Sequence, residues 1–380
     1  MQLKRAAEGN GDRSIPSLDG LRAFSVLSVI LGHIKAPALD GLPFLLPFRH
    51  GDLGVAMFFV ISGFLITHLL LQEQNKTGRI NLRAFYLRRT LRIFPPFYVY
   101  VAIVAMMAVL RVYSVPPAAF FLALTYTWNL GAYSGLWIFG HLWSLSLEEQ
   151  FYLFWPSFVR HLGRATNLRS AALLFCFAPL IRVVAFFVLP PYYQERLHTT
   201  LFLFPDHFLA GCILALALDS AAYDGLFRRF ARIGYAVPAA LYLYVIDPYL
   251  YIRYRAFRPL VGYTAEALCI GVILIFVVLQ PRSLIGRLLN VRPVRHLGMI
   301  SYSLYLWQQM FTGPDTGRFV PFPANAIAIF LCAEASYWLI ERPAQALKQK
   351  LAHGRTSGHP AALAVRTRPV LIQSVDPNTE

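Results

Sequence analysis

Long apolar stretches, separated by short polar segments, recur along the whole of this 380-residue chain. A helix of about 20 apolar residues can cross the hydrocarbon core of a bilayer. Stretches near this length lie at 18–36, 53–72, 93–111, 142–159, 171–189, 201–218, 234–247, 260–279, 297–312 and 323–340. The pattern predicts an all-α fold, a polytopic transmembrane helical bundle with about ten spans.

One further apolar stretch, 116–130, is shorter, and we expect it to form a re-entrant or peripheral helix at the outer face. The chain then divides into a cytoplasmic N-terminal segment, 1–16, a transmembrane domain, 17–343, and a C-terminal tail, 344–380. The tail is polar and contains Gly, Pro, Ser and Thr. We therefore expect it to be a poorly ordered cytoplasmic end.

The basic residues predict the orientation, because cytoplasmic loops of membrane proteins carry an excess of Lys and Arg. With a cytoplasmic N-terminus, the inner loops are richer in Arg and Lys than the outer loops; they lie near 76–92, 160–169, 228–232 and 282–295. Both termini are thus predicted to be cytoplasmic. One basic run, RYRAFR at 253–258, falls on the predicted outer side. It either faces an anionic acceptor or shows that the order of spans is wrong there.

The composition agrees with a membrane protein and excludes other classes. Hydrophobic residues make up 57% of the chain and charged residues 14%, whereas about a quarter of a soluble domain is charged. The net charge of +16 does not indicate a nucleic-acid partner, since the basic residues are scattered among loops. The four cysteines lie in apolar stretches without a CxxC pair, so neither a disulfide framework nor a metal site is expected.

The first apolar stretch contains two ionisable residues, Arg22 and His33, which are costly in hydrocarbon. His33 follows Arg22 by 11 positions. At about 100° per residue both lie on one face of a helix, about 16 Å apart along its axis. Each alone could be structural, as a snorkelling arginine or a hydrogen-bonded core histidine. The shared face favours a functional pair, with a cation near the cytosol and an imidazole deeper in the membrane.

The second stretch begins with an acidic residue, Asp52, at its outer end. Asp52 could meet His33 across the intervening turn and set the tautomer of the imidazole; an interfacial loop aspartate is an equal alternative. Gly54, Ser62 and Gly63 follow, and we interpret these small residues as packing positions that let helices approach closely in lipid.

Three further groups of polar residues could bind a ligand. Arg88 and Arg92 are four positions apart, hence on one helix face, and two such guanidiniums can clamp a phosphate; positive-inside topology also explains basic residues here. In the fourth stretch, Ser144, Glu148 and Tyr152 recur at helical spacing. A carboxylate inside a span indicates a site, although a salt-bridged structural pair is the alternative. The segment SYSLYLWQQ, 301–309, has the polar and aromatic side chains that suit carbohydrate.

Taken together, these segments resemble the acyltransferase-3 family of integral membrane acyltransferases, which includes O-acetylases of cell-surface polysaccharides. The matching segments are LDGLRAFSVLSVILGH, GVAMFFVISGFLIT, RRTLRIFPPFY, LWSLSLEEQFYLFWP, ISYSLYLW and IERPA. They follow the family's order between residues 17 and 343. No single motif is decisive, but the ordered set is highly specific.

The resemblance implies transfer of an acyl group, usually acetyl, from cytosolic acyl-CoA to a hydroxyl of an extracytoplasmic glycan or related acceptor. The protein would be a multi-pass protein of the bacterial inner membrane. His33 matches the catalytic histidine of the family and Glu148 the carboxylate of its WSLS-x-E segment, so both are predicted to be catalytic. Arg22 matches the arginine that accompanies this histidine, and the pair Arg89 and Arg92, in RTLR, falls in the family's basic motif, with Arg88 adjacent. The predicted binding residues for the acyl-CoA co-substrate are therefore Arg22, Arg88, Arg89 and Arg92. His33 would either carry the acyl group on nitrogen or act as a general base.

The chain departs from the family's pattern at two positions. Many members have an aspartate in the second span where Ala56 stands here, and a histidine after LYLW where Gln308 stands here. These departures bring into question any role for a second histidine or a second-span carboxylate. The rival hypothesis from another class is a transporter of an acyl donor, a lipid-linked sugar or a small anion, in which the same buried charges form a permeation relay.

Overall fold

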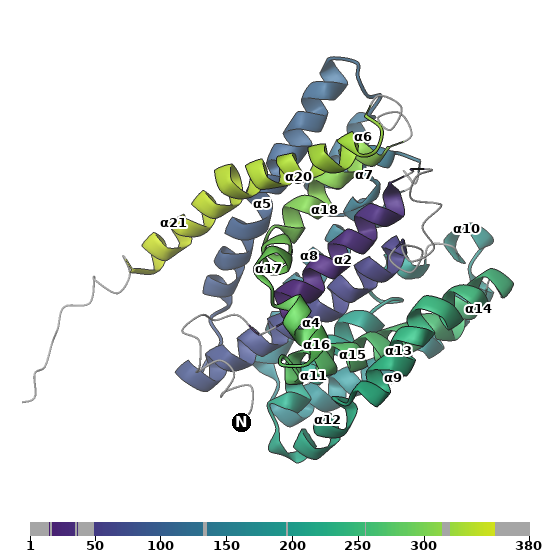
Figure 1. Ribbon diagram of the computed structural model, residues 1–380, viewed down its shortest axis with the longest axis vertical. Helices are drawn as coiled ribbons and strands as arrows, with labels where there is room; N and C mark the ends of the chain where they lie inside the picture. Colours follow the sequence, from purple (N-terminus) through teal and green to yellow (C-terminus); the bar gives the residue numbers. More distant parts are fainter. Residues whose placement is uncertain are drawn as a thin grey trace, which may run out of the picture.

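The computed structural model of the protein describes residues 17–34, 49–131, 135–194, 197–254, 256–313 and 320–353, together with Ile15 and Ala36. Every regular element among these residues is a helix (Figure 1). The predicted all-α fold class is confirmed. Of the two predicted terminal segments, nearly all of 1–16 and the part 354–380 of the tail lie outside the described residues.

Ten longer helices form the bundle: α2 (Leu18–His33), α4 (Gly51–Thr77), α5 (Leu82–Val109), α8 (Leu142–His161), α9 (Arg164–Val188), α11 (Asp206–Leu218), α15 (Tyr263–Leu279), α18 (Ser301–Thr312), α20 (Ala324–Ser336) and α21 (Arg342–His353). Three π-helical segments extend or join helices, namely η5 (Tyr242–Ile246) between α13 (Ile233–Leu241) and α14 (Asp247–Arg253), η6 (Arg258–Gly262) before α15, and η7 (Tyr337–Glu341) between α20 and α21. The short elements are α6 (Pro117–Leu124), η2 (Trp128–Leu130), α7 (Trp137–Gly140), α10 (Pro191–Gln194), η3 (Leu197–Thr199), η4 (Ala221–Tyr223), α12 (Asp224–Phe230), α16 (Leu284–Leu289) and α17 (Arg292–Met299).

Each of the ten predicted spans overlaps a helix or a continuous run of helices. Six runs are long and apolar enough to cross a membrane; they are 51–77, 82–109, 164–188, 233–253, 258–279 and 324–347. The other four overlap α2, α8, α11 and α18, which are shorter or more polar, and for these a span stays a prediction. All four helices have ionisable or amide side chains that face the interior of the bundle. In a membrane protein such side chains face inward, since partners for them are found there and not in lipid.

Helix α5 begins earlier than its apolar stretch predicts. Asn81 caps it by accepting a hydrogen bond from the backbone nitrogen of Ala84 at 3.1 Å, and Pro95 and Pro96 lie inside it without ending it. The basic motif that the sequence places before the third span is therefore helical itself. The last helical run likewise extends past residue 343 to His353.

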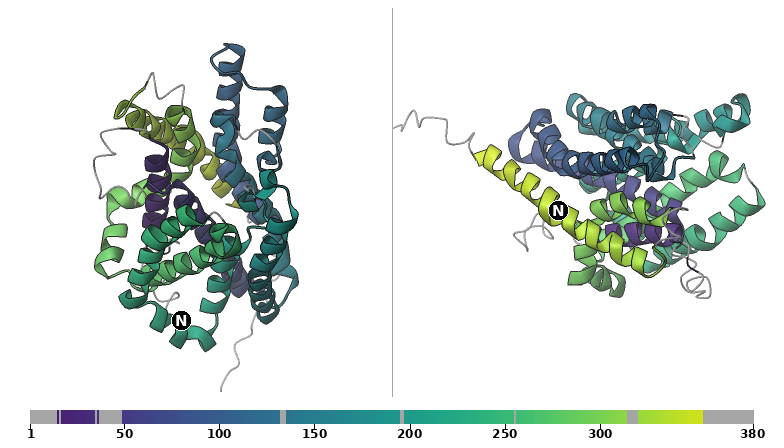
Figure 2. Two further views of the ribbon diagram at one scale, coloured as in Figure 1. Left: turned by 90° about the vertical axis from the view of Figure 1, so that its right-hand side faces the viewer. Right: turned by 90° about the horizontal axis from the view of Figure 1, so that it is seen from above.

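Helix α4 lies at the centre of the bundle and packs against α2, α8, α11 and α15. In Figure 1, α2, α8 and α18 lie in the middle of the molecule, with α5, α20 and α21 on one side and α9, α13 and α15 on the other. The run from α20 through α21 lies along α5 on the outside (Figure 2). Helix α9 points apolar side chains outward, among them Leu180, Val184 and Phe187, as a lipid-facing helix does.

Glycines permit the closest contacts of α4. A Cβ atom added at Gly63 would lie 2.0 Å from the backbone oxygen of Phe208 in α11, and one added at Gly54 would lie 2.5 Å from the backbone oxygen of Ser25 in α2. The neighbouring atoms are backbone, which cannot rotate away. The interpretation of Gly54 and Gly63 as packing positions is confirmed, whereas Ser62, the third position of that set, has polar contacts described below.

The substitution Gly63→Ala is expected to destabilise the bundle, because the added methyl group forces α4 and α11 apart. Overpacking of this kind costs about 1–3 kcal/mol, which a thermal unfolding experiment in detergent detects as a lower transition temperature. Gly271→Ala in α15 is the matched control, since its Cβ would meet only a side-chain atom of Leu214 at 3.4 Å. An equal decrease in transition temperature in both variants would contradict the conclusion that Gly63 is required for close contact between α4 and α11.

Candidate functional site

Three of the predicted donor-binding arginines line one pocket, which we call the arginine pocket. It has an empty volume of about 730 Å3, part of it open to solvent. Its polar lining consists mainly of Arg22, Ser62, Arg89, Arg92, Glu148 and Tyr152. Arg22 comes from the beginning of α2, and Arg89 and Arg92 lie one helical turn apart near the beginning of α5. The fold therefore gathers at one end of the bundle charges that are far apart in the sequence.

The arginine pocket has more positive than negative charge among its lining residues. Arg92 lies close enough to Arg22 and Arg89 for electrostatic repulsion. Among the described residues, neither Arg22 nor Arg92 has a carboxylate oxygen within the 4.0 Å of an ion pair. Guanidiniums that are held together without paired carboxylates form a binding site for phosphate or another anion.

Glu148 belongs to this pocket too. Its Oε2 lies 4.0 Å from Nη2 of Arg89, and its Oε1 accepts a hydrogen bond from Ser62 Oγ at 3.0 Å. Tyr152 donates to Ser62 at 2.8 Å and places its ring 3.5 Å from the guanidinium carbon of Arg89. The polar face predicted for this helix is confirmed, since Ser144, Glu148 and Tyr152 all line the pocket. The guanidinium of Arg89 thus lies between the carboxylate of Glu148 and the ring of Tyr152.

Arg88 points elsewhere. Its Nη2 lies 3.0 Å from Oε2 of Glu73 in an ion pair at the partly exposed surface, and it is not among the residues that line the arginine pocket. The spacing of Arg88 and Arg92 on one helix face suggested that these two residues bind a phosphate together. In the structure Arg89 and Arg92 are the two arginines of α5 that line the pocket with Arg22.

His33 lies at the opposite end of α2 from Arg22. Its ring packs edge-on against Trp137, with 5.3 Å between the ring centroids. Its Nδ1 lies 2.9 Å from Oε1 of Gln308 in α18. The spacing argument therefore holds: α2 carries a cation into the arginine pocket and an imidazole about three turns away.

A chain of hydrogen bonds determines which nitrogen of His33 carries the proton. Nε2 of Gln309 donates to the backbone oxygen of Trp137 at 2.9 Å, and this oxygen can only accept. Oε1 of Gln309 then accepts from Nε2 of Gln308 at 2.8 Å, which turns Oε1 of Gln308 toward His33. Nδ1 of His33 must therefore be the donor. In the neutral ring Nε2 keeps its lone pair and is the nitrogen that can act as a base or nucleophile.

The hypothesis that Asp52 sets this tautomer is wrong, because Gln308 occupies the Nδ1 side. Asp52 interacts with His33 electrostatically, but its Oδ2 lies 3.6 Å from Nη1 of Arg258. The residue that sets the tautomer stands where many family members have a histidine. The sequence did indicate this position, because Gln308 departs there from the pattern of the family.

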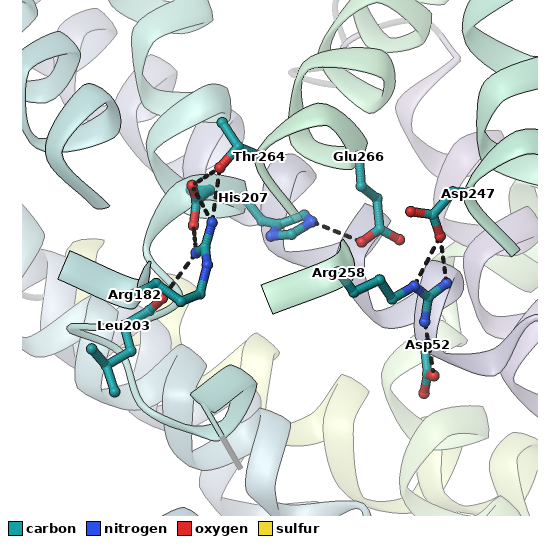
Figure 3. A network of polar contacts seen from close by, with 9 residues as sticks. Asp52, Arg182, Leu203, His207, Asp247, Arg258, Thr264 and Glu266 are labelled. Atoms are coloured by element: carbon teal, nitrogen blue, oxygen red, sulfur yellow. Dashed lines mark hydrogen bonds and ion pairs between the residues drawn. The ribbon is translucent and has the colours of Figure 1, made fainter. Parts of the chain in front are cut away.

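Sequence reasoning missed a second polar network, formed mainly by α9, α11, α14, η6 and α15 (Figure 3). The guanidinium of Arg182, which is fully buried, lies 2.5 Å from Oδ2 of Asp206. Arg258 donates to Asp247 through Nε and Nη2 at 2.9 and 2.7 Å, and Glu266 lies 3.4 Å from His207. The sequence could have indicated this network, because most of its ionisable residues interrupt apolar stretches. The basic run at 253–258 ends at Arg258, and this pairing shows that the charge of Arg258 is not free to bind an anionic acceptor. Arg255, in the same run, lies outside the described residues.

Comparison with known proteins identifies the class. The family model described as an acyltransferase domain matches residues 15–339. The protein is therefore an integral membrane protein that carries an acyltransferase-family domain. It belongs to the acyltransferase-3 family.

Two relatives illustrate the similarity. The peptidoglycan O-acetyltransferase OatA of Listeria monocytogenes is 28% identical over 359 residues, which cover 87% of this chain and 55% of the relative. The O-acetyltransferase OatA of Staphylococcus aureus is 30% identical over 372 residues, which cover 90% of this chain and 59% of the relative. The chain thus spans little more than half the length of these relatives. No solved structure matches it.

Replacing Gln308 is expected to slow acyl transfer, because Nδ1 of His33 loses its acceptor and the ring can bind its proton on either nitrogen. Gln308→Leu should lower the transfer rate about tenfold or more, since a hydrogen bond to a group that becomes charged contributes about 1.5–3 kcal/mol. Gln308→Glu keeps an acceptor oxygen and should retain more activity. Equal activity of the leucine variant and the unaltered protein would contradict the tautomer assignment, which 15N NMR of labelled histidine measures directly.

Proposed function

We propose that this protein transfers an acetyl group from acetyl-CoA, bound at the cytoplasmic end of the bundle, to a hydroxyl of a cell-envelope glycan at the other end. The observation that carries the proposal is the geometry of α2, which joins the arginine pocket to an imidazole with a free Nε2. The relatives named as O-acetyltransferases support acetyl as the group and a glycan, the class that includes peptidoglycan, as the acceptor.

The proposed orientation places both termini in the cytoplasm and counts ten spans, including α2, α8, α11 and α18. The beginning of α2 and the beginning of α5 are then cytoplasmic, which agrees with the positive-inside rule. The arginine pocket faces the compartment that contains acyl-CoA, and His33 lies toward the outer half of the bundle. The membrane is the inner membrane of a bacterium.

The donor binds through its phosphates. In the proposal Arg22, Arg89 and Arg92 hold them by charge-assisted hydrogen bonds. The pantetheine arm then extends along α2 toward His33, across the helical rise of about 16 Å. No metal takes part in the proposed mechanism.

Nε2 of His33 performs the chemistry. Acting as a base, it takes the proton of the acceptor hydroxyl while the hydroxyl oxygen bonds to the thioester carbon; the carbon–sulfur bond breaks and the CoA thiolate receives the proton. Acting as a nucleophile, the same nitrogen bonds to the thioester carbon as the carbon–sulfur bond breaks and the CoA thiolate leaves. The acceptor oxygen then bonds to the acetyl carbon as the carbon–nitrogen bond breaks, and the hydroxyl proton passes to the thiolate. Both routes need the lone pair that the Gln308 hydrogen bond leaves on Nε2.

Glu148 and Arg88 have different places in the proposal. The contacts of Glu148 with Arg89 and Ser62 support a role in orienting the donor-binding arginine, and a direct catalytic role of Glu148 stays a prediction. Arg88, paired with Glu73, is proposed to contribute to donor binding only through the general positive charge of this surface.

The function is tested with purified protein in proteoliposomes, [14C]acetyl-CoA outside and peptidoglycan oligosaccharides on both sides. Radiolabel should become covalently attached to the oligosaccharide. His33→Ala should reduce that rate by about 10²–10⁴-fold, the usual contribution of a general acid–base group, whereas His161→Ala, an exposed histidine at the end of α8, should not change it. Label that crosses the membrane without joining any acceptor would establish a transporter instead, and transfer that survives His33→Ala would remove His33 from the mechanism.

Donor binding is tested separately on the arginines of α5. Arg92→Ala should weaken acetyl-CoA binding about tenfold or more, because a charge-assisted hydrogen bond to phosphate contributes about 1.5–3 kcal/mol. Arg83→Ala, on the exposed surface of the same helix, is the matched control and should bind normally. Arg88→Ala should show a smaller loss than Arg92→Ala. Equilibrium binding of acetyl-CoA to the variants in nanodiscs measures these losses of affinity. A larger loss in Arg88→Ala than in Arg92→Ala would contradict the assignment of Arg92 to the donor pocket.

A further inference from the structure

A second pocket adjoins the arginine pocket. It has an empty volume of about 1570 Å3, part of it open to solvent. Among the described residues, Asp52, Arg258 and Glu266 are its charged lining, and aromatic rings such as Trp143, Tyr251 and Tyr263 form much of the remainder. Val55 and Phe59 of α4 line both pockets. These two apolar side chains are therefore the partition between them.

The second pocket lies at the end of the bundle that carries His33. Asp52 is in the first turn of α4, which packs against α2, where His33 is the last residue. A Cβ atom at the neighbouring Gly51 would lie 4.0 Å from Nε2 of His33, and Asp52 interacts with His33 electrostatically. The rim of the second pocket is thus next to the reactive nitrogen.

The charge of the second pocket is opposite to that of the arginine pocket. Among the described lining residues, Arg258 supplies the guanidinium, which is held between Asp247 at 2.7 Å and Asp52 at 3.6 Å. Around Arg258 the carboxylates of Asp52, Asp247 and Glu266 therefore outnumber its single positive charge (Figure 3). Such a pocket repels the phosphates of acyl-CoA and favours an uncharged or amine-bearing ligand.

Buried ion pairs hold the wall of the second pocket in place. Arg182 of α9 donates to Asp206 of α11 and, at 2.8 Å, to Oγ1 of Thr264 in α15. It also donates to the backbone oxygen of Pro259 at 2.6 Å, directly after Arg258. Because these contacts join three helices, the lining groups are preorganised, as a binding site requires.

The lining chemistry matches a sugar. Aromatic rings present apolar faces on which the C–H face of a pyranose can lie, and carboxylates accept hydrogen bonds from its hydroxyls. Tyr251, whose ring lies 4.7 Å from the guanidinium carbon of Arg258, is at the exposed side of this arrangement. We propose that the second pocket is the acceptor subsite and binds an uncharged or amine-bearing sugar ring of the glycan, with one hydroxyl directed to Nε2 of His33. This assignment rests on the proposed function.

The experiment measures binding without chemistry, using the His33→Ala protein in nanodiscs and three oligosaccharides of equal length. The probes are a tetramer of N-acetylglucosamine, its de-N-acetylated tetramer with free amines, and a tetramer of galacturonate. The neutral and amine-bearing probes should bind at least tenfold more tightly than the carboxylate-bearing probe. Tight binding of galacturonate, or no binding of any probe, would overturn the assignment.

Variants then locate the site. Added to the His33→Ala protein, Tyr251→Ala should weaken binding of the tighter probe about tenfold, the scale of losing an aromatic contact together with its buried area. Tyr249→Ala, at an exposed position of the same helix, is the matched control and should bind normally. Unchanged binding in the Tyr251 variant would place the sugar elsewhere.

A kinetic measurement separates this inference from the proposed function. In protein with His33 intact, Tyr251→Ala should raise the KM for the oligosaccharide about tenfold and leave the KM for acetyl-CoA unchanged. If the unaltered protein transfers acetyl groups but Tyr251→Ala keeps its KM for the oligosaccharide, the subsite assignment fails and the proposed function stands. If the unaltered protein transfers no acetyl group to any glycan, the proposed function is wrong, and the subsite assignment that rests on it is wrong as well.

Discussion

The close packing of α4 against its neighbours is the constraint on which the other features depend. Gly63 of α4 and Gly211 of α11 lie so close to the opposing backbone that an added Cβ would be 2.0 Å from a carbonyl oxygen in either direction. Between apolar helices in lipid there is little hydrophobic force, so close van der Waals contact must supply the attraction. With α4 held in this way, its side chains Val55 and Phe59 stand between two pockets of opposite charge.

Polar groups inside the bundle follow from the same environment. A bilayer offers no water to an ionised side chain, so each must find a partner or line a hydrated pocket. Arg182 and Arg258 are paired with carboxylates, and these pairs support the walls of the second pocket. Arg22 and Arg92 are not paired in this way among the described residues, and they line a pocket. This contrast distinguishes Arg182 and Arg258, which are structural charges, from Arg22 and Arg92, which are proposed to bind the donor together with Arg89.

Sequence patterns predicted the site where one helix was sufficient for the argument. The common face of Arg22 and His33, and that of Ser144, Glu148 and Tyr152, follow from helical periodicity alone. Predictions that needed the relation between two helices were less successful. Asp52 was one of two equal alternatives, a partner that orients His33 or an interfacial aspartate, but Gln308 contacts the ring from α18, because packing brings the end of that helix beside the end of α2.

The sequence by itself determined that this is an all-helical membrane protein, where its apolar helices lie, and that its motifs belong to a membrane acyltransferase family. These properties depend on hydrophobicity and local periodicity, which are written in consecutive residues. Only the tertiary structure decided that Arg88 pairs with Glu73 outside the arginine pocket, which nitrogen of His33 carries the proton, and that Arg258 is paired with acids. Those properties depend on the rotation and register of helices against one another, and side chains far apart in the chain set both.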